Sequence, residues 1–157
     1  MRIARASRKH IVALAELMTA SPLLRRYGVT ARGARASLDQ ALRRRDTLLV
    51  ALEREEVVGL AWVIATRALD RAAYLRLLLV AEAYQSGGVG AALLADAERR
   101  ARALDCRHMV LLVTTTNRRA RAFYVRQGYR HVGVVPDFVQ PRISESLYVK
   151  SWRTDET

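Results

Sequence analysis

The spacing of apolar residues along the chain predicts an alternation of strands and helices. Short β-rich runs bounded by turn residues are typical of strands, whereas apolar residues that recur at helical spacing predict amphipathic helices. The runs predict strands over residues 2–6, 47–53, 57–66, 75–80, 108–114, 129–135 and 145–152. The periodic segments predict helices over about 8–19, 30–45, 88–104 and 117–127, with a loop over 21–29 and a connection over 67–72.

The order of these elements predicts a mixed sheet with helices on both faces, which is an α/β (α+β) fold. Only the charged residues 54–56 separate the second and third strands, so these two should form a hairpin. The strand over 108–114 is almost continuously apolar, as expected where both of its faces are covered. A single helix joins it to the strand over 75–80, which predicts a parallel pair with a right-handed crossover. Because no linker or repeat interrupts this pattern, we expect a single domain over residues 1–157.

The composition is that of a folded globular chain with a strongly basic surface. The 157 residues are 51% hydrophobic and carry a formal net charge of +12. Nearly all of the cations are arginines, because Lys9 and Lys150 are the only lysines, and the arginines are spread along the chain. We interpret the charge as a surface that attracts a polyanionic cofactor or an acidic partner, and we expect no specific nucleic-acid binding.

The sequence predicts a cytoplasmic protein without a membrane span. No apolar run reaches the roughly 18 residues that a spanning helix needs, and the basic N-terminus lacks the apolar segment of a secretion signal. Cys106 is the only cysteine, which excludes an internal disulfide and fits a reducing compartment. We interpret Cys106 as a small core residue.

A glycine-containing turn is the strongest chemical signal in the sequence. The apolar run over 75–80 is followed by Gly87, Gly88 and Gly90, and a helical pattern begins there. Backbone N–H groups of such a turn, together with the positive end of the helix, form an anion-binding cradle. The turn has no Gly-Lys-Ser or Gly-Lys-Thr sequence and lacks the small third residue of a dinucleotide fingerprint, so neither of these common motifs fits.

Two motifs, in the turn over residues 85–90 and in the segment over residues 117–129, resemble those of the GNAT family of N-acetyltransferases. The turn Gln85-Ser86-Gly87-Gly88-Val89-Gly90 is similar to the family's acetyl-CoA signature, Gln/Arg-x-x-Gly-x-Gly/Ala. Downstream, the segment from Asn117 to Tyr129 follows the family pattern Asn-x-x-Ala-x-x-Phe/Leu-Tyr-x-x-x-Gly-Phe/Tyr. The resemblance covers nearly the whole chain and implies a mixed sheet of about seven strands. It also implies two central parallel strands that splay apart to admit the cofactor.

The resemblance further implies acetyl transfer from acetyl-CoA to a primary amine, with no metal. Asn117 should contact the cofactor arm, and Tyr124 stands at the family's general-acid position. A backbone N–H near Leu78 should polarise the thioester carbonyl. The residues expected to bind the cofactor are Leu78, Leu79, Val80, Gln85, Ser86, Gly87, Gly88, Val89, Gly90, Asn117 and Tyr124.

The acceptor and the general base stay open at this stage. Family members that acetylate ribosomal-protein N-termini carry a glutamate where this chain has Leu112, which argues against the same acceptor. A water chain or one of several acids and histidines would take the proton of the amine. The candidate bases are Glu82, His108, His131, Asp137 and Glu145, and the candidate acceptor-lining aromatics are Tyr27, Trp62 and Tyr74.

Three further expectations concern partners and alternative functions. A homodimer would use the C-terminal strand, which carries Leu147, Val149 and Trp152. One alternative function is a catalytically inactive acyl-CoA sensor, which needs the cradle but not Tyr124. The other alternative is a basic acetyltransferase associated with RNA or the ribosome.

Overall fold

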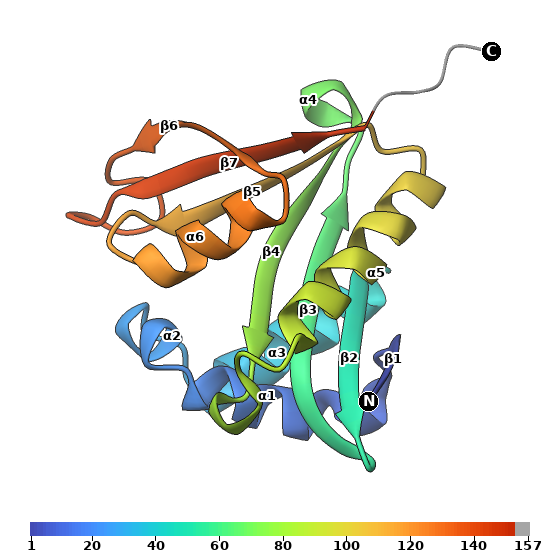
Figure 1. Cartoon of the computed structure of the whole chain (residues 1–157). Helices are drawn as coiled ribbons and strands as arrows, with labels where there is room; N and C mark the ends of the chain where they lie inside the picture. The colour runs from blue at the N-terminus through green and yellow to red at the C-terminus, as the bar shows by residue number, and fades with distance from the viewer. Residues whose placement is uncertain (153–157) are drawn as a thin grey trace. The chain divides into compact units, whose positions relative to one another are not determined.

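The strands of the protein form one mixed sheet in the order β1-β2-β3-β4-β5-β7-β6 (Figure 1), in a computed structural model that describes residues 1–152. The strands are β1 (Arg2–Arg5), β2 (Thr47–Glu53), β3 (Glu56–Ala65), β4 (Ala72–Val80), β5 (His108–Thr114), β6 (Arg130–Val135) and β7 (Glu145–Ser151). The helices are α1 (Ile11–Ala20), α2 (Pro22–Arg26), α3 (Ala31–Arg43), α4 (Ala68–Arg71), α5 (Val89–Ala103) and α6 (Arg118–Arg126), with 3-10 turns η1 (Arg8–His10) and η2 (Glu82–Tyr84). This mixed seven-stranded sheet confirms the predicted fold class.

The chain divides into two compact units. The first unit contains residues 1–64 and 77–100, and the second contains residues 65–76 and the chain from residue 101 onward. The strand β4 and the helix α5 each contribute residues to both units, so neither unit is a continuous stretch of sequence. The expectation of a single domain stays a prediction.

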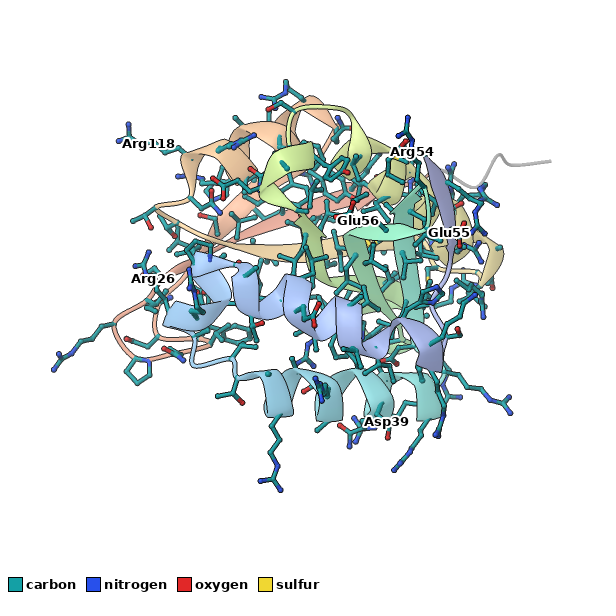
Figure 2. All side chains as sticks on the ribbon, turned by 90° about the horizontal axis from the view of Figure 1, so that it is seen from below. Arg26, Asp39, Arg54, Glu55, Glu56 and Arg118 are labelled. Carbon is teal, nitrogen blue, oxygen red and sulfur yellow. The ribbon has the colours of Figure 1, made fainter. Side chains whose placement is uncertain are left out.

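In the first unit, β2 and β3 form the predicted hairpin with a tight, charged tip. Glu53 pairs with Glu56, so only Arg54 and Glu55 make the turn (Figure 2). Both turn residues have positive φ angles, 46° and 68°. Two consecutive residues of this kind are typical of a type I′ turn, whose twist matches that of the flanking strands.

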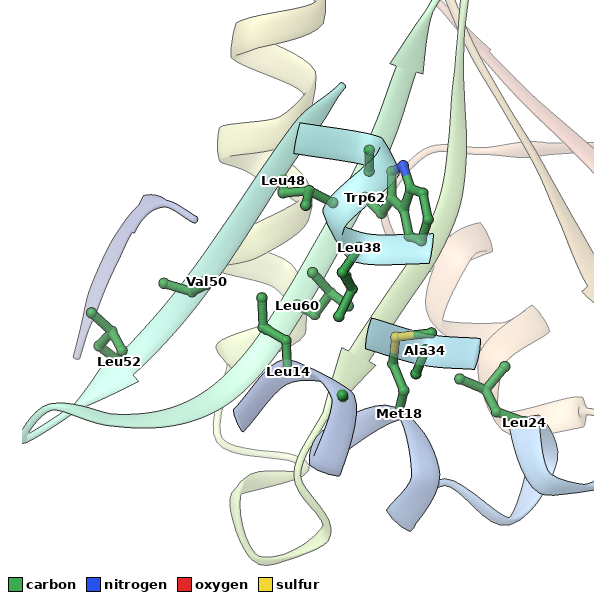
Figure 3. Packing of buried hydrophobic residues seen from close by; sticks show 12 residues of the cluster. Leu14, Met18, Leu24, Ala34, Leu38, Leu48, Val50, Leu52, Leu60 and Trp62 are labelled. Atoms are coloured by element: carbon green, nitrogen blue, oxygen red, sulfur yellow. The ribbon is translucent and has the colours of Figure 1, made fainter. Parts of the chain in front are cut away.

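Both faces of this hairpin are covered, which explains the nearly continuous apolar sequence of β2. One face packs against α1 and α3, where Leu14 and Leu38 are completely buried in one cluster with Leu60 of β3 (Figure 3). On the opposite face, Leu93 of α5 approaches Gly59. Successive side chains of a strand point to opposite faces, so a strand covered on both sides is apolar at nearly every position.

In the second unit, β5 pairs with β4 along one edge and with β7 along the other. The beginning of β4 pairs with it in parallel, with Ala72–Leu75 opposite His108–Leu111, which agrees with the predicted crossover. This ladder ends before either strand does, as expected for the two central strands of this fold. The strand β7 pairs with β5 along its other edge, and α6 packs against this sheet through Tyr124, whose ring lies 6.4 Å from that of Tyr148.

The C-terminal strand β7, which we expected to serve a homodimer, is paired on both of its edges. Leu147 of β7 lies opposite Leu112 of β5 on one side and opposite Gly133 of β6 on the other. Both edges of β7 are therefore occupied within the second unit, and β6 is the edge strand at this end of the sheet. A dimer formed by backbone pairing at this end would therefore use β6, and a dimer through the side chains of the C-terminal strand stays a prediction.

Residues 21–29, expected as a loop, contain the short helix α2. Pro22 occupies its first turn, where the missing N–H of proline has no cost. The hydroxyl oxygen of Ser21 accepts a hydrogen bond of 3.4 Å from the N–H of Leu24 and caps the helix. A helix of five residues is too short to show apolar periodicity, which is why the pattern indicated only a loop.

The connection over 67–72 contains α4, a turn of left-handed backbone. Leu69, Asp70 and Arg71 have φ angles of 48°, 56° and 60°. Such a run is costly for residues with side chains, and side-chain contacts accompany it here. Asp70 Oδ2 lies 3.0 Å from His108 Nε2 and 3.5 Å from Arg107 Nε. The hydrogen bond with His108 and the charge of Arg107 hold the pKa of Asp70 below its ordinary value.

Candidate active site

The glycine turn lies between η2 and α5 in the first unit. Gly88 has a φ angle of 85°, and Ser86, although it carries a side chain, has one of 65°. The N–H of Ala92 donates a hydrogen bond of 3.0 Å to the carbonyl oxygen of Gly88, which begins the ladder of α5. The N–H groups of residues 89–91 precede this ladder and have no acceptor within the helix. Together with the positive end of α5, they provide the chemistry of an anion site.

The three glycines of the turn do not have the same role. Gly88 is required by its backbone conformation, because side chains disfavour its positive φ. A Cβ atom on Gly87 would lie 3.5 Å from the carbonyl oxygen of Tyr84, which is an ordinary contact. Gly90 lies in the first turn of α5, after the buried Val89.

Three hydrogen bonds shape the segment that leads into the turn. The N–H of Ala81 donates to the carbonyl oxygen of Val58 at 2.8 Å, which fixes the end of β4 to β3. The Tyr84 hydroxyl donates to Glu56 Oε2 at 3.2 Å, and this hydrogen bond raises the pKa of Tyr84. The Gln85 amide donates to the carbonyl oxygen of Val80 at 3.1 Å. The side chain of Gln85, predicted to contact the cofactor, thus also closes the loop on which the cradle is built.

Gly59 supports the cradle from β3 and was not recognised from the sequence. A Cβ atom at this position would lie 2.8 Å from Leu93 Cδ1 and 3.2 Å from both Val89 Cγ1 and the carbonyl oxygen of Leu79. The start of α5 and the end of β4 therefore approach the backbone of β3 more closely than any side chain would allow. An isolated glycine inside a strand pattern is the signal that could have identified this close approach.

The last residues of β4 are less buried than its first ones. Ala72, Ala73 and Leu75 are buried, whereas the apolar residues from Leu77 to Val80 are each only half-buried. Half-buried aliphatic side chains beside an anion cradle suit a ligand that carries an apolar or amide-containing arm on a charged group. The predicted contacts of Leu78, Leu79 and Val80 with a pantetheine arm stay a prediction.

In the second unit, Asn117 caps the helix that carries Tyr124. Asn117 Oδ1 accepts a hydrogen bond of 3.2 Å from the N–H of Ala120, which fills the capping role. Its side-chain NH₂ group makes no hydrogen bond to any residue that the structure describes. The predicted contact of this amide with the cofactor arm stays a prediction.

Tyr124 combines a buried ring with an unpaired hydroxyl. It is 8% exposed, and the rings of Phe123 and Tyr129 pack edge-on against it at 5.1 Å and 5.6 Å. Within residues 1–152 its hydroxyl has no hydrogen-bond partner. Burial raises the pKa of Tyr124 far above the ordinary value for tyrosine, because the surroundings disfavour the phenolate. The hydroxyl thus keeps its proton at neutral pH, as a general acid must.

The three candidate acceptor-lining aromatics have different surroundings. Trp62 is 3% exposed in the core cluster of the first unit, and its indole N–H donates to Asp46 Oδ2 at 3.0 Å, which favours a packing role. Tyr27 follows α2 and is half-buried. Tyr74 lies on β4 in the second unit, where burial raises its pKa. Tyr27 and Tyr74 therefore stay candidates for acceptor contacts.

The five candidate bases differ in their contacts and in their burial. His108 lies 3.0 Å from Asp70 Oδ2 and 2.7 Å from the Ser151 hydroxyl, and Asp137 accepts a hydrogen bond of 2.6 Å from the N–H of Arg142. These two groups have structural partners. Glu82 and His131 are exposed, whereas Glu145 is 3% exposed at the start of β7. Among the five, Glu145 is the only buried carboxylate.

The described part of the chain has neither a cluster of potential metal ligands nor a helix that could span a membrane. Residues 1–152 contain no group of three or more His, Cys, Asp or Glu side chains that could hold a metal ion. None of the helices in this range is long and apolar enough to cross a membrane.

Solved structures of acetyltransferases share this fold. An aminoglycoside 6'-N-acetyltransferase complexed with coenzyme A superposes with a TM-score of 0.83 at 16% identity, over 99% of this chain and 100% of that one. A ribosomal-protein-alanine N-acetyltransferase from Brucella melitensis gives a TM-score of 0.79 at 21% identity, over 97% and 100% of the two chains. At these identities the likeness establishes the fold alone.

Sequence comparisons give the family. The uncharacterized protein YdhI of Bacillus subtilis (strain 168) is 36% identical over 56 residues, which is 36% of this chain and 35% of that relative's length. The model of the acetyltransferase (GNAT) family matches residues 13–129, which include the cradle, Asn117 and Tyr124. This range is most of the chain, and it confirms the resemblance that the two motifs indicated. The chain belongs to the acetyltransferase (GNAT) family.

Proposed function

We propose that the protein transfers the acetyl group of acetyl-CoA directly to a primary amine of a small molecule or a protein. The family match carries this proposal, because it includes both the cradle of the first unit and Tyr124 of the second. Residues 1–157 would act as one acetyltransferase domain in the cytoplasm.

In this proposal the chain binds the cofactor mainly through its backbone. The N–H groups at the start of α5 and the turn over 85–90 bind the pyrophosphate. Leu78–Val80 pair with the amides of the pantetheine arm, and an N–H near Leu78 polarises the thioester carbonyl. Asn117 donates its side-chain N–H groups to the same arm. Acetyl-CoA supplies the activated thioester.

Tyr124 is the proposed proton donor. When the amine nitrogen bonds to the acetyl carbon, the carbon–sulfur bond breaks and the sulfur leaves with the electron pair. The phenol of Tyr124 protonates this thiolate, and its position in the family motif and its unpaired hydroxyl support this role. The proton lost by nitrogen passes to ordered water or to a carboxylate, for which Glu145 is the buried candidate.

The acceptor is not the same in all proteins that share this fold. One solved structure named above is of an aminoglycoside acetyltransferase and another is of a ribosomal-protein-alanine acetyltransferase. In this chain a half-buried Leu112 lies on β5 where the ribosomal-protein enzymes carry a glutamate. This difference favours a small-molecule amine or another protein amine as the acceptor.

Two measurements test the proposal. Calorimetry should show saturable binding of coenzyme A, and a panel of amines incubated with acetyl-CoA should yield an acetylated product by mass spectrometry. Absence of coenzyme A binding would refute the proposal. If coenzyme A bound without any turnover, and if Tyr124→Phe left this binding unchanged, the protein would be an acyl-CoA sensor instead. The RNA-associated alternative would be supported if RNA retention fell steeply as the salt concentration rose, because contacts with phosphates release counterions.

A further inference from the structure

An open groove of about 430 Å³ lies along α6 in the second unit. Five of its lining residues come from one face of this helix, and the sixth comes from β7. They are Arg118, Arg121, Ala122, Val125, Arg126 and Tyr148, which we call the α6 groove. None of these residues has a role in the acetyl-transfer proposal.

The α6 groove is strongly cationic. Residues 117–136 contain five arginines and no aspartate or glutamate. Arg118 and Arg126 are exposed and have no salt bridge within residues 1–152, and Figure 2 shows the side chain of Arg118 extended away from the ribbon. The two exposed charges of Arg118 and Arg126 therefore attract anions.

One arginine of the groove is held in a fixed position. Arg121 Nε donates to the Tyr148 hydroxyl at 3.0 Å, and Arg121 Nη1 donates to the carbonyl oxygen of Thr115 at 3.1 Å. Two hydrogen bonds from one guanidinium restrict its rotamers, so less side-chain entropy is lost when this charge pairs with a ligand.

The floor of the α6 groove is aliphatic. Val125 is 57% exposed and Ala122 is also exposed, so this helix face presents apolar surface to solvent between Arg118 and Arg126. The one aromatic residue of the lining, Tyr148, is 1% exposed. Single-stranded nucleic acids bind through bases stacked on exposed aromatic rings, and the groove offers none. An aliphatic side chain on the ligand would cover Val125.

We propose that the α6 groove binds an acidic polypeptide segment. Carboxylates of the segment would pair with Arg118 and Arg126, and an aliphatic side chain between them would pack on Val125. Charge complementarity and the aliphatic floor select this partner. The proposal does not depend on acetyl transfer, because binding can be measured without turnover.

Fluorescence anisotropy with a short, fluorescein-labelled peptide of repeated Glu-Glu-Leu tests the proposal. The variant carrying both Arg118→Glu and Arg126→Glu should bind the peptide at least about tenfold more weakly than the parent protein at low salt. The matched control carries Arg32→Glu and Arg35→Glu, two exposed positions of α3 that have no salt bridge within residues 1–152, and should bind as the parent does. Val125→Ser should also weaken binding, and circular dichroism verifies that each variant is folded.

Several outcomes would overturn the proposal. Equal losses in the groove variant and the control would show only an effect of net charge. A short oligouridylate that bound more tightly than the peptide, and was released by the groove substitutions, would make the groove a nucleic-acid site. Competition between acetyl-CoA and the peptide, with weaker coenzyme A binding in the groove variant, would assign the arginines to the cofactor.

Discussion

The side-chain amide of Gln85 donates a hydrogen bond of 3.1 Å to the backbone carbonyl oxygen of Val80. This bond joins the end of β4 to the start of the glycine turn, which are the two stretches that we assign to the cofactor arm and to the pyrophosphate. A side chain that fixes the backbone between two binding stretches improves affinity by reducing the freedom that is lost on binding. The glutamine of the motif thus has a positioning role in addition to any direct contact.

Replacing Gln85 with alanine should therefore weaken coenzyme A binding. One hydrogen bond of this kind is worth about 1 kcal/mol, which corresponds to a rise in Kd of roughly fivefold. Calorimetric titration measures the change, and Gln40→Ala, at an exposed position of α3, is the matched control. An unchanged Kd in the Gln85 variant would contradict the positioning role.

Replacing Gly59 with alanine should destabilise the first unit. The added Cβ atom would lie 2.8 Å from Leu93 Cδ1, so the buried Leu93 side chain or α5 must shift, and overpacking of this kind costs about 1–3 kcal/mol. Gly133→Ala on β6 is the matched control, because nothing lies within 4 Å of its Cβ position. Denaturant unfolding of both variants measures the difference, and equal free energies of unfolding would be inconsistent with this close approach.

Replacing Tyr124 with phenylalanine should lower kcat while leaving the fold intact. The hydroxyl has no partner within residues 1–152, so its removal breaks no hydrogen bond there. Loss of a general acid typically costs on the order of 10²-fold or more in rate. Steady-state thiol release with acetyl-CoA and an identified acceptor measures kcat, while thermal unfolding provides the control. A variant with the kcat of the parent would rule out Tyr124 as the acid.

Asp70 should make stability depend on pH in the acid range. Its folded-state pKa is held below the ordinary value for aspartate, first by the hydrogen bond with His108 and then by the charge of Arg107. This contribution is present above the unfolded-state pKa and is lost as pH falls through the folded-state pKa. Asp70→Asn tolerates the left-handed backbone and removes the titration.

The parent protein should lose more stability on acidification than the Asp70→Asn variant does. Free energies of unfolding from denaturant titrations at neutral and acid pH provide the comparison. Parallel pH dependences for the two proteins would show that this carboxylate is not coupled to folding.

Replacing Arg54 with asparagine and Glu55 with glycine should stabilise the hairpin. Both positions have positive φ angles, which these two residue types adopt with less strain, and the gain should be about 0.5–1.5 kcal/mol. The exposed salt bridge between Arg2 and Glu55 would be lost, but such pairs contribute little. The control for composition carries the same two residue types in the reverse order, as Arg54→Gly and Glu55→Asn. A decrease in the denaturation midpoint of the Asn-Gly variant would disprove the turn assignment.

The sequence predicted most elements of this fold because their signals are local. The hairpin around residues 54 and 55 and the parallel strands joined by α5 follow from apolar runs and chain order. The helix α2 and the left-handed turn at α4 could not be read in this way, because neither is long enough to show a period. The position of β7 between β5 and β6 depends on long-range pairing, which a pattern along the chain does not encode.

The candidate site was predicted unevenly for a related physical reason. The turn over 85–90, Asn117 and Tyr124 have sequence signals, because glycine, a helix cap and a fixed helical spacing are properties of short segments. The contacts of Gln85 with Val80 and of Gly59 with α5 depend on rotamers and on the distance between elements. Burial and the hydrogen bond to Asp46 separate Trp62 from Tyr27 and Tyr74, and the residue type alone predicts neither.

The position of β7 in the sheet has a consequence for the order in which parts of the protein can fold during synthesis. Strands β5 and β6 meet only through β7, the last strand of the described chain, and its Tyr148 contacts the ring of Tyr124. While the chain is being synthesised, the second unit cannot complete its sheet until residues 145–151 have emerged from the ribosome. The pairing of β2 with β3 does not depend on residues 145–151. In a nascent chain halted before β7, the hairpin could therefore form, but the strands of the second unit would keep unpaired edges. Chaperones and proteases recognise such unpaired edges.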